Sequence, residues 1–142
     1  MLDPCPPDRC PTLLKITPII EVEINEPDAN PLDEFLASIE KLRVIPDSVD
    51  ILPSHNMPFK GLHARLDALQ HHHDNRLNQF LDTCVRLMTA KELSDEVFPL
   101  GLDPQNVVFA IGETMAHLNY LCRHGSIVRE RRDDGVYLYA HR

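Results

Sequence analysis

Histidine side chains are the first groups in this sequence whose chemistry suggests a metal site. Three of the eight stand together as His71, His72 and His73, in a segment whose apolar residues recur every three or four positions. Adjacent residues on a helix project roughly 100° apart, so three neighbouring imidazoles diverge and do not converge on one metal ion. We expect His73 to be buried on the apolar face and His71 and His72 to face solvent or an interface. The pattern leaves the role of all three open.

His55 stands in a different setting. It follows the apolar run Val49–Leu52 in the sequence ILPSHN, at the end of a predicted strand. Loops that follow strands commonly carry site residues. A single histidine nevertheless supplies one of the three or four protein ligands that zinc takes. His55 is therefore a candidate metal ligand with an incomplete site around it.

Two of the four cysteines, Cys5 and Cys10, have a spacing that zinc sites use. They lie in a proline-rich end, and no second pair stands nearby, so the indication of a zinc site is weak. Cys84 and Cys122 fall on apolar helical faces, where free cysteine packs as a small hydrophobic residue. The cysteine pattern does not indicate a disulfide scaffold.

The composition is that of a soluble globular protein of about one domain. The 142 residues are 43% hydrophobic and 25% charged, and no apolar run approaches the roughly 20 residues that cross a bilayer. The start lacks the basic region and apolar core of a signal peptide, so we expect a cytoplasmic protein. The net charge of −8 is concentrated in residues 1–57, with 11 Asp and Glu against 4 Lys and Arg, whereas residues 58–142 have 11 against 10. This asymmetry suggests two parts of different origin.

The sequence of the first part predicts an irregular end followed by a strand, a helix and a second strand. Residues 1–15 contain too many prolines for a helix or a central strand. Ile16–Ile24 alternates apolar and polar residues, which predicts a half-buried strand. Asn30 before Pro31 predicts a helix start with Asn30 as N-cap, and the apolar stripe that follows predicts a helix to Leu42. Val49–Leu52 then predicts a short buried strand.

The second part begins with one long amphipathic helix, Gly61–Met88, around which the chain is organised. Mostly apolar residues recur along it every three or four positions, so they share one helical face that is predicted to be buried: Leu62, Leu66, Leu69, His73, Leu77, Phe80, Cys84 and Leu87. Thr89 and Glu92 form a capping box, which predicts a short helix to about Phe98.

A third helix is predicted from Asp103-Pro104 to Gly125, with one apolar face made of Val108, Ile111, Met115, Leu118 and Cys122. Ser126–Arg132 and Val136–Ala140 are β-prone segments, and the Asp134-Gly135 pair between them favours a hairpin turn. The order of these elements is that of a winged helix. The predicted fold class is α+β and mostly helical, with domains at 1–15, 16–60 and 61–142.

A winged helix that binds DNA presents basic and amide side chains on its third helix. Here the polar face of that helix carries Gln105, Asn106, Glu113, His117, Tyr120 and Arg123. His117 follows Glu113 by one turn, which indicates a surface pair. In the hairpin, Arg129, Arg131 and Arg132 are offset by Glu130, Asp133 and Asp134. Because the net charge also opposes phosphate binding, we favour a winged helix used for packing over one that binds nucleic acid.

Several separated motifs, taken in order, resemble the carboxy-terminal part of metallo-β-lactamase-fold hydrolases. The first group is Ile16-Thr17-Pro18, Ala29-Asn30-Pro31-Leu32, Phe35-Leu36-Ala37-Ser38, Leu52-Pro53-Ser54-His55-Asn56, Pro58-Phe59-Lys60-Gly61-Leu62 and His72-His73-x-x-Arg76-Leu77. Thr89–Phe98 and Gly112–Leu121 resemble the winged-helix unit that one branch of this family carries after its catalytic domain. The likeness covers roughly Lys15 to Tyr139.

The resemblance implies a role for His55 as the last metal-ligand histidine of the family's P-x-H-G type motif, although Asn56 stands where the family usually has glycine. The family's H-x-H-x-D-H motif and its later histidine ligand are absent from the 142 residues. Arg9-Cys10 stands where the Gly-Asp pair with the bridging aspartate belongs, and Asp8 is out of register. The resemblance thus implies no catalytic residue in this chain, no cofactor bound by the chain alone, and a two-zinc site in an intact family member.

Two functions remain open from the sequence. In the first, the chain is part of a metal-dependent hydrolase of thioesters, lactones or similar esters, inactive alone, whose winged helix serves packing, the substrate entrance or oligomerisation. In the second, it is a free-standing winged-helix module that binds protein or nucleic acid. We also expect a homodimer, because the predicted strands Ile16–Ile24 and Val49–Leu52 would expose unpaired edges. The missing catalytic portion is the other expected partner, and no membrane is.

Overall fold

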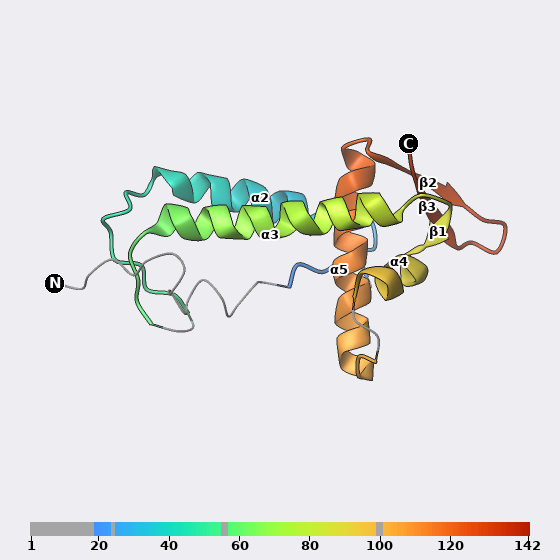
Figure 1. Ribbon diagram of the computed structural model, residues 1–142, viewed down its shortest axis with the longest axis horizontal. Helices are drawn as coiled ribbons and strands as arrows, with labels where there is room; N and C mark the ends of the chain where they lie inside the picture. Colours follow the sequence, from blue (N-terminus) through green and yellow to red (C-terminus); the bar gives the residue numbers. More distant parts are fainter. Residues whose placement is uncertain (1–18, 24, 55–56, 99–100) are drawn as a thin grey trace. The chain divides into compact units, whose positions relative to one another are not determined.

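The structure is a computed structural model that describes residues 19–23, 25–54, 57–98 and 101–142 (Figure 1). Its helices are α2 (Pro31–Lys41), α3 (Leu62–Thr83), α4 (Ala90–Val97) and α5 (Pro104–Arg123), with a 3₁₀ turn at Leu42–Val44. Its strands are β1 (Met88–Thr89), β2 (Ile127–Arg131) and β3 (Tyr137–His141). The predicted class, α+β and mostly helical, is confirmed.

The contacts divide the described residues into two compact units. Unit 1 contains Leu36–His73, and unit 2 contains Ile19–Phe35 together with Asp74–Arg142. Both α2 and α3 therefore contribute residues to each unit. The division into domains at residues 15 and 60 stays a prediction. None of the helices that the structure describes could span a lipid bilayer.

The long helix α3 exists but is shorter than predicted, because it ends at Thr83 and not at Met88. Most of the predicted face is buried, with Leu66 2% exposed and Phe80 0% exposed. Leu87, which we expected on the same face, is 43% exposed. The helical period continues in the sequence, but the chain leaves the helix so that Met88 can pair with Tyr139 of β3.

The short helix α4 begins as the capping box predicts. The Thr89 hydroxyl oxygen accepts a hydrogen bond from the Glu92 amide at 3.2 Å, and the Thr89 amide donates to the Glu92 carboxylate at 2.8 Å. These two bonds satisfy amide groups that lack a partner within the helix. The predicted helix start is confirmed.

Helix α5 also begins and ends as predicted, with the Asp103 carboxylate accepting from the amides of Gln105 and Asn106. Its predicted apolar face is only partly right, because Val108 is 59% exposed whereas Leu118 is 0% exposed. The residues actually buried cover more than one stripe: Ala110, Thr114, Ala116, His117, Leu118, Asn119 and Leu121. A helix that packs on several sides does not show one simple face in its sequence.

The terminal hairpin is confirmed, and it belongs to a three-stranded antiparallel sheet of order β1-β3-β2. Gly135 in the turn has φ 89°, a conformation that glycine adopts without the strain other residues incur. Val128 pairs with Ala140, and Met88 pairs with Tyr139, a residue that is 1% exposed. The pairing of β1 was not predicted, since two residues are too short for a strand pattern.

The strand predicted at Ile16–Ile24 is wrong where it can be checked, because residues 19–23 form no strand. This segment instead lies against α5, where the Val22 amide donates to the Gly112 carbonyl at 3.2 Å. Gly112 permits this approach, since a Cβ atom there would lie 2.9 Å from the Cβ of Glu21. Alternation of apolar and polar residues indicates an extended segment with one buried side. It does not indicate whether a strand or a helix packs against that side.

The buried strand predicted at Val49–Leu52 is also wrong. Only Ile51 pairs there, in a single bridge with Phe59, while Val49 is 43% and Leu52 is 79% exposed. Helix α2 begins at Pro31 as expected, but its predicted side-chain cap is absent. Asn30 is 7% exposed, and its side-chain oxygen has no hydrogen-bond partner among the described residues. Leu42, predicted on the apolar stripe, is 42% exposed.

Candidate functional site

The metal ligand implied by the family resemblance, His55, lies outside the described residues, as do Asn56, Cys5 and Cys10. The structure does describe the chain on both sides of positions 55 and 56. Ile51 and Phe59 exchange two backbone hydrogen bonds, at 2.8 and 3.1 Å. This bridge fixes the separation of the two backbone segments that lead to and from the predicted ligand.

His63 and Asp47 anchor the segment before that bridge in unit 1. The His63 Nε2 atom donates to the carbonyl oxygens of Arg43 and Ile45, at 3.0 and 2.9 Å. The Asp47 carboxylate accepts from the His63 amide at 2.8 Å, where α3 begins. Arg43 in turn forms an ion pair with Asp67 at 2.7 Å. The start of α3 therefore holds residues 43–47 by both backbone and side-chain contacts.

The three adjacent histidines diverge as helix geometry predicts. His73 is 1% exposed, which confirms its predicted burial, whereas His71 lies at the surface. His72 is half-buried, and its ring meets that of His73 edge to face with centroids 5.2 Å apart. The three side chains occupy three different environments.

The described residues do not fit a zinc site. Among them, no group of three or more His, Cys, Asp or Glu side chains is arranged to hold a metal ion. Zinc takes four protein ligands in structural sites and three in catalytic ones.

The surface pair predicted for Glu113 and His117 is wrong. His117 is 0% exposed, its Nδ1 atom bonds to the Glu113 backbone carbonyl at 2.7 Å, and its ring lies 5.5 Å from that of Phe80. The Glu113 side chain, 15% exposed, faces Arg76 of α3, with Nε and Oε1 3.5 Å apart. Burial raises the pKa of Glu113, and the charge of Arg76 offsets this only in part.

Arg76 and Glu113 form a half-buried ion pair that joins α3 to α5 in unit 2. The Arg76 guanidinium also lies 4.5 Å above the centre of the Phe98 ring and donates to Gln79 at 3.1 Å. Its Nε atom is buried and makes no hydrogen bond to any described residue. Sequence reasoning included both residues in the family motifs but did not predict their contact.

Several of the polar side chains that a DNA-binding winged helix would present are engaged within the protein. Arg129 pairs with Asp28 at 2.7 Å, and Arg132 pairs with Asp134 at 2.7 Å. Asn106 bonds the Asp103 cap of its own helix at 2.6 Å. Exposed donors on α5 and in the hairpin are therefore fewer than the sequence suggests.

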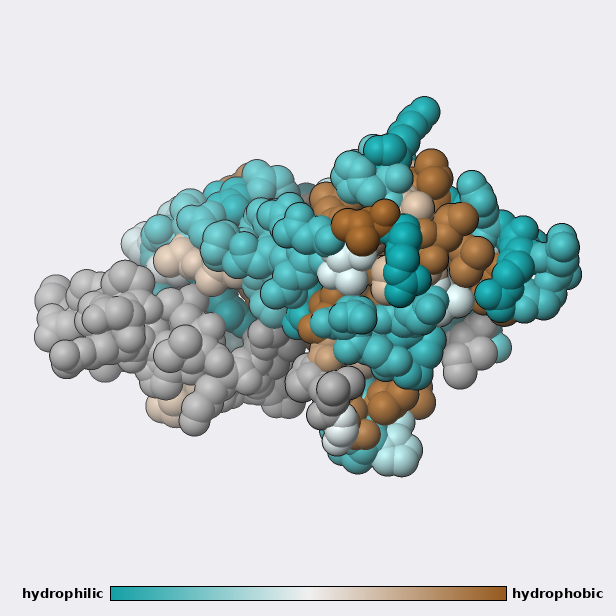
Figure 2. Space-filling view, turned by 45° about the vertical axis from the view of Figure 1, so that its right-hand side comes forward, coloured by the Kyte–Doolittle hydropathy of each residue, from teal (hydrophilic) through white to brown (hydrophobic). Residues whose placement is uncertain are grey.

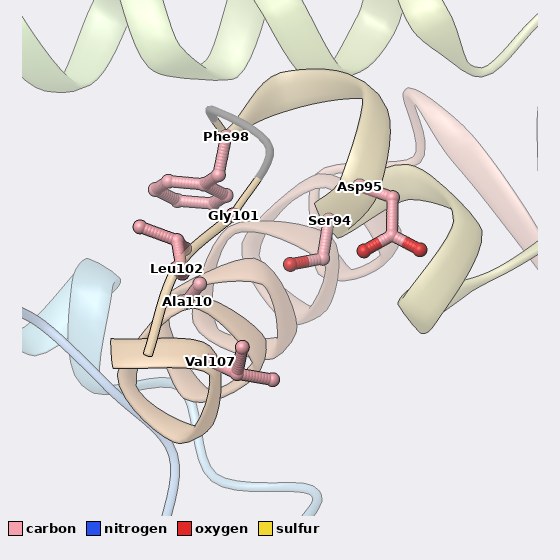
Figure 3. Close-up of a pocket in the computed structure, with 7 residues that line it drawn as sticks. All are labelled: Ser94, Asp95, Phe98, Gly101, Leu102, Val107 and Ala110. Atoms are coloured by element: carbon pink, nitrogen blue, oxygen red, sulfur yellow. The ribbon is translucent and has the colours of Figure 1, made fainter. Parts of the chain in front are cut away.

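A small hollow lies between α4, the segment that follows it and α5 (Figure 3). Its cavity volume is about 110 Å³, below the roughly 300 Å³ at which small-molecule sites usually begin. The residues around it are Ser94, Asp95, Phe98, Gly101, Leu102, Val107 and Ala110. The Asp95 carboxylate already accepts from Lys91. This hollow has neither the volume nor the convergent polar groups of a substrate site.

Comparison with known proteins decides the family. A family model described as the metallo-β-lactamase-like C-terminal domain matches residues 77–142. The structure is similar to a β-lactamase domain protein from Burkholderia ambifaria, at 39% sequence identity and a TM-score of 0.80 over 86% of this chain. This chain has the sequence and fold of the carboxy-terminal part of a metallo-β-lactamase-fold protein. The resemblance found in the sequence motifs is confirmed.

A second solved metallo-β-lactamase family protein, from Thermus thermophilus, is 30% identical with a TM-score of 0.72 over 91% of this chain. The metallo-β-lactamase-like chain spans 37% of the length of the Burkholderia protein and 39% of the Thermus protein. The search of curated proteins found no match.

Proposed function

We propose that this chain is part of a metal-dependent hydrolase of the metallo-β-lactamase superfamily, acting on a thioester, lactone or similar ester. The observation that carries the proposal is the likeness in fold over 86% of the chain at 39% identity. In this role the chain supplies one family-matched ligand, His55, and an accessory domain. It is inactive alone, because the motif that supplies most of the family's metal ligands is absent from its sequence.

The accessory domain is, in this proposal, a winged helix. Its order of helix α3, strand β1, helices α4 and α5 and strands β2 and β3 supports this assignment, with the β2–β3 hairpin as the wing. The domain packs against the catalytic portion, shapes the substrate entrance or joins two copies. The pairing of Arg132 with Asp134 and the net charge of −8 favour such packing over nucleic-acid binding.

The test is complementation by the missing portion. The purified chain, without a histidine tag, is mixed with the Burkholderia protein truncated before the region that this chain matches. We expect a complex that retains zinc after dialysis and hydrolyses a panel of thioesters and lactones. Zinc content and hydrolysis should fall with His55→Ala and not with His71→Ala, which changes an exposed histidine. If the complex with His55→Ala retains as much zinc as the complex with the wild-type chain, the proposal is contradicted.

The alternative is a free-standing module that binds another protein, and exposed apolar side chains favour it. Figure 2 shows hydrophobic surface, in brown, over the unit that carries the sheet. The large exposed apolar residues there include Val85, Leu87, Val128, Val136 and Tyr137. A homodimer would cover such a surface in both copies. Sedimentation at micromolar concentration distinguishes a dimer from a monomer of 16.2 kDa.

A further inference from the structure

The turn before α2 is held within unit 2 by three polar side chains of α5 and β2. The Asn119 amide nitrogen donates to the carbonyl oxygens of Pro27 and Ala29, both at 2.8 Å. Arg123 donates to the Asp28 carbonyl oxygen at 2.9 Å, and Arg129 pairs with the Asp28 carboxylate at 2.7 Å. Asp28 therefore receives one guanidinium on its backbone and another on its side chain.

A hollow of about 230 Å³ opens where these groups meet. Its walls are formed by Asp28, Asn119, Cys122, Arg123 and Arg129. Three of these residues come from one face of α5, at the spacing of a single turn. The volume is smaller than that of a typical drug-sized pocket and suits a small ion or one terminal group of a larger molecule.

The charges in this hollow do not balance. The single carboxylate is paired with Arg129, and Arg123 has no carboxylate partner among the described residues, since it donates to a carbonyl oxygen. The Arg129 guanidinium is also held 4.2 Å above the Tyr137 ring. Burial raises the pKa of the Cys122 thiol, so this side chain adds no negative charge near neutral pH.

We propose that this hollow binds a small oxyanion, a carboxylate or a phosphate group, through Arg123 and Arg129. A guanidinium presents several N–H donors in a planar fork that matches both a carboxylate and a phosphate. Arg123 and Arg129 each use only a few of these donors in hydrogen bonds within the described part of the protein. Asp28 limits the affinity by its charge and keeps Arg129 in place. All residues that line the hollow belong to unit 2. The proposal rests on these residues alone and does not depend on the hydrolase assignment.

The test is a titration of the full chain with inorganic phosphate and, separately, with acetate. Ionic strength is held constant with sodium chloride, and the side-chain NMR signals of Arg123 and Asn119 are followed. We expect saturation at one site for at least one of the two ions. The two arms distinguish a site for phosphate from one for a carboxylate.

Variants give the comparison that decides. Arg123→Met should weaken binding by about tenfold or more, since hydrogen bonds to charged groups contribute about 1.5–3 kcal/mol. Arg123→Lys keeps the charge but loses the planar fork, so its affinity should lie between that of the wild type and that of Arg123→Met. Asp28→Asn should bind the ion more tightly than the wild type. Arg131→Met is the matched control, because Arg131 is exposed on the same strand as Arg129 and does not line the hollow.

Two results would overturn the proposal. One is a linear response without saturation for both ions. The other is equal binding by the wild type and by Arg123→Met while circular dichroism shows both to be folded. If Arg123→Met does not fold, the comparison of Arg123→Lys and Asp28→Asn with the wild type replaces it, and unchanged affinity in both would count against the site.

Discussion

Arg76 of α3 and Glu113 of α5 face each other with 3.5 Å between Nε and Oε1, and their side chains are 21% and 15% exposed. Burial raises the pKa of Glu113 despite the nearby cation. The desolvation of the carboxylate thus outweighs its attraction to Arg76, as is common for buried ion pairs.

This relationship predicts a pH dependence of stability. A carboxyl group whose pKa is higher in the folded than in the unfolded state stabilises the fold below its ordinary pKa, and that contribution is lost as pH rises through the folded value. From about pH 4.3 upward, the wild type should therefore lose free energy of unfolding relative to Glu113→Gln. Urea unfolding between mildly acidic and neutral pH measures the difference, with exposed Glu96→Gln as control. If the free energy of unfolding of the wild type minus that of Glu113→Gln stays constant or increases as pH rises, the sign of the predicted effect is wrong.

Phe80→Ala should lower the free energy of unfolding by about 3–5 kcal/mol, because it empties a fully buried position. The ring is 0% exposed and lies 6.5 Å from Phe98 and 5.5 Å from His117, centre to centre. Denaturant unfolding followed by circular dichroism measures the loss. Val85→Ala, at a position 79% exposed, is the control and should cost under about 0.5 kcal/mol. A loss below about 1 kcal/mol for Phe80→Ala would contradict the packing described.

The fold and the candidate site differ in how much the sequence could predict. The starts of α4 and α5 and the terminal hairpin were predicted correctly, because Thr89, Asp103 and Gly135 act on the backbone within a few residues of themselves. The end of α3 was missed, since Met88 leaves a continuing helical pattern for a distant partner, Tyr139. Tertiary pairing there overrides local propensity.

The errors at the candidate site have the same origin. Position 117 follows Glu113 at the spacing of a surface pair, yet α5 buries His117 completely. The contact of Glu113 with Arg76 joins two helices whose relative rotation no local pattern specifies. Family motifs included these residues without stating what each one touches.

Gly112→Ala should displace residues 19–23 from α5. The added Cβ would lie 2.9 Å from the Cβ of Glu21 and 3.1 Å from its carboxylate, while alanine itself favours the helix by up to about 1 kcal/mol. The expected signature is therefore local: hydrogen exchange of the Val22 amide, which donates to the Gly112 carbonyl, should speed up while α5 stays folded. Val108→Ala, an exposed change on the same helix, should leave that amide protected. Unchanged exchange at Val22 in Gly112→Ala would count against the contact.

Cys84 should resist alkylation near pH 8. Burial, with a smaller contribution from Cys122, raises the pKa of its thiol to about 11, and the side chain is 0% exposed. The reactive thiolate is therefore rare in the folded state. Iodoacetamide labelling followed by peptide mass spectrometry should find Cys84 modified only after denaturant is added. Labelling of Cys84 at the rate of the unfolded chain would contradict this environment.

Thr89 belongs to two structures at once. Its backbone stands opposite Leu138 in the sheet, and its hydroxyl and amide begin α4 through Glu92. A shift of β3 by one residue along β1 would break the hydrogen bonds between these strands. They could form again only if Thr89, which also caps α4, moved with the strand. The alignment of the strands and the first turn of α4 therefore form together or fail together, which excludes neighbouring alignments that the β-prone sequence of Tyr137–His141 would otherwise permit.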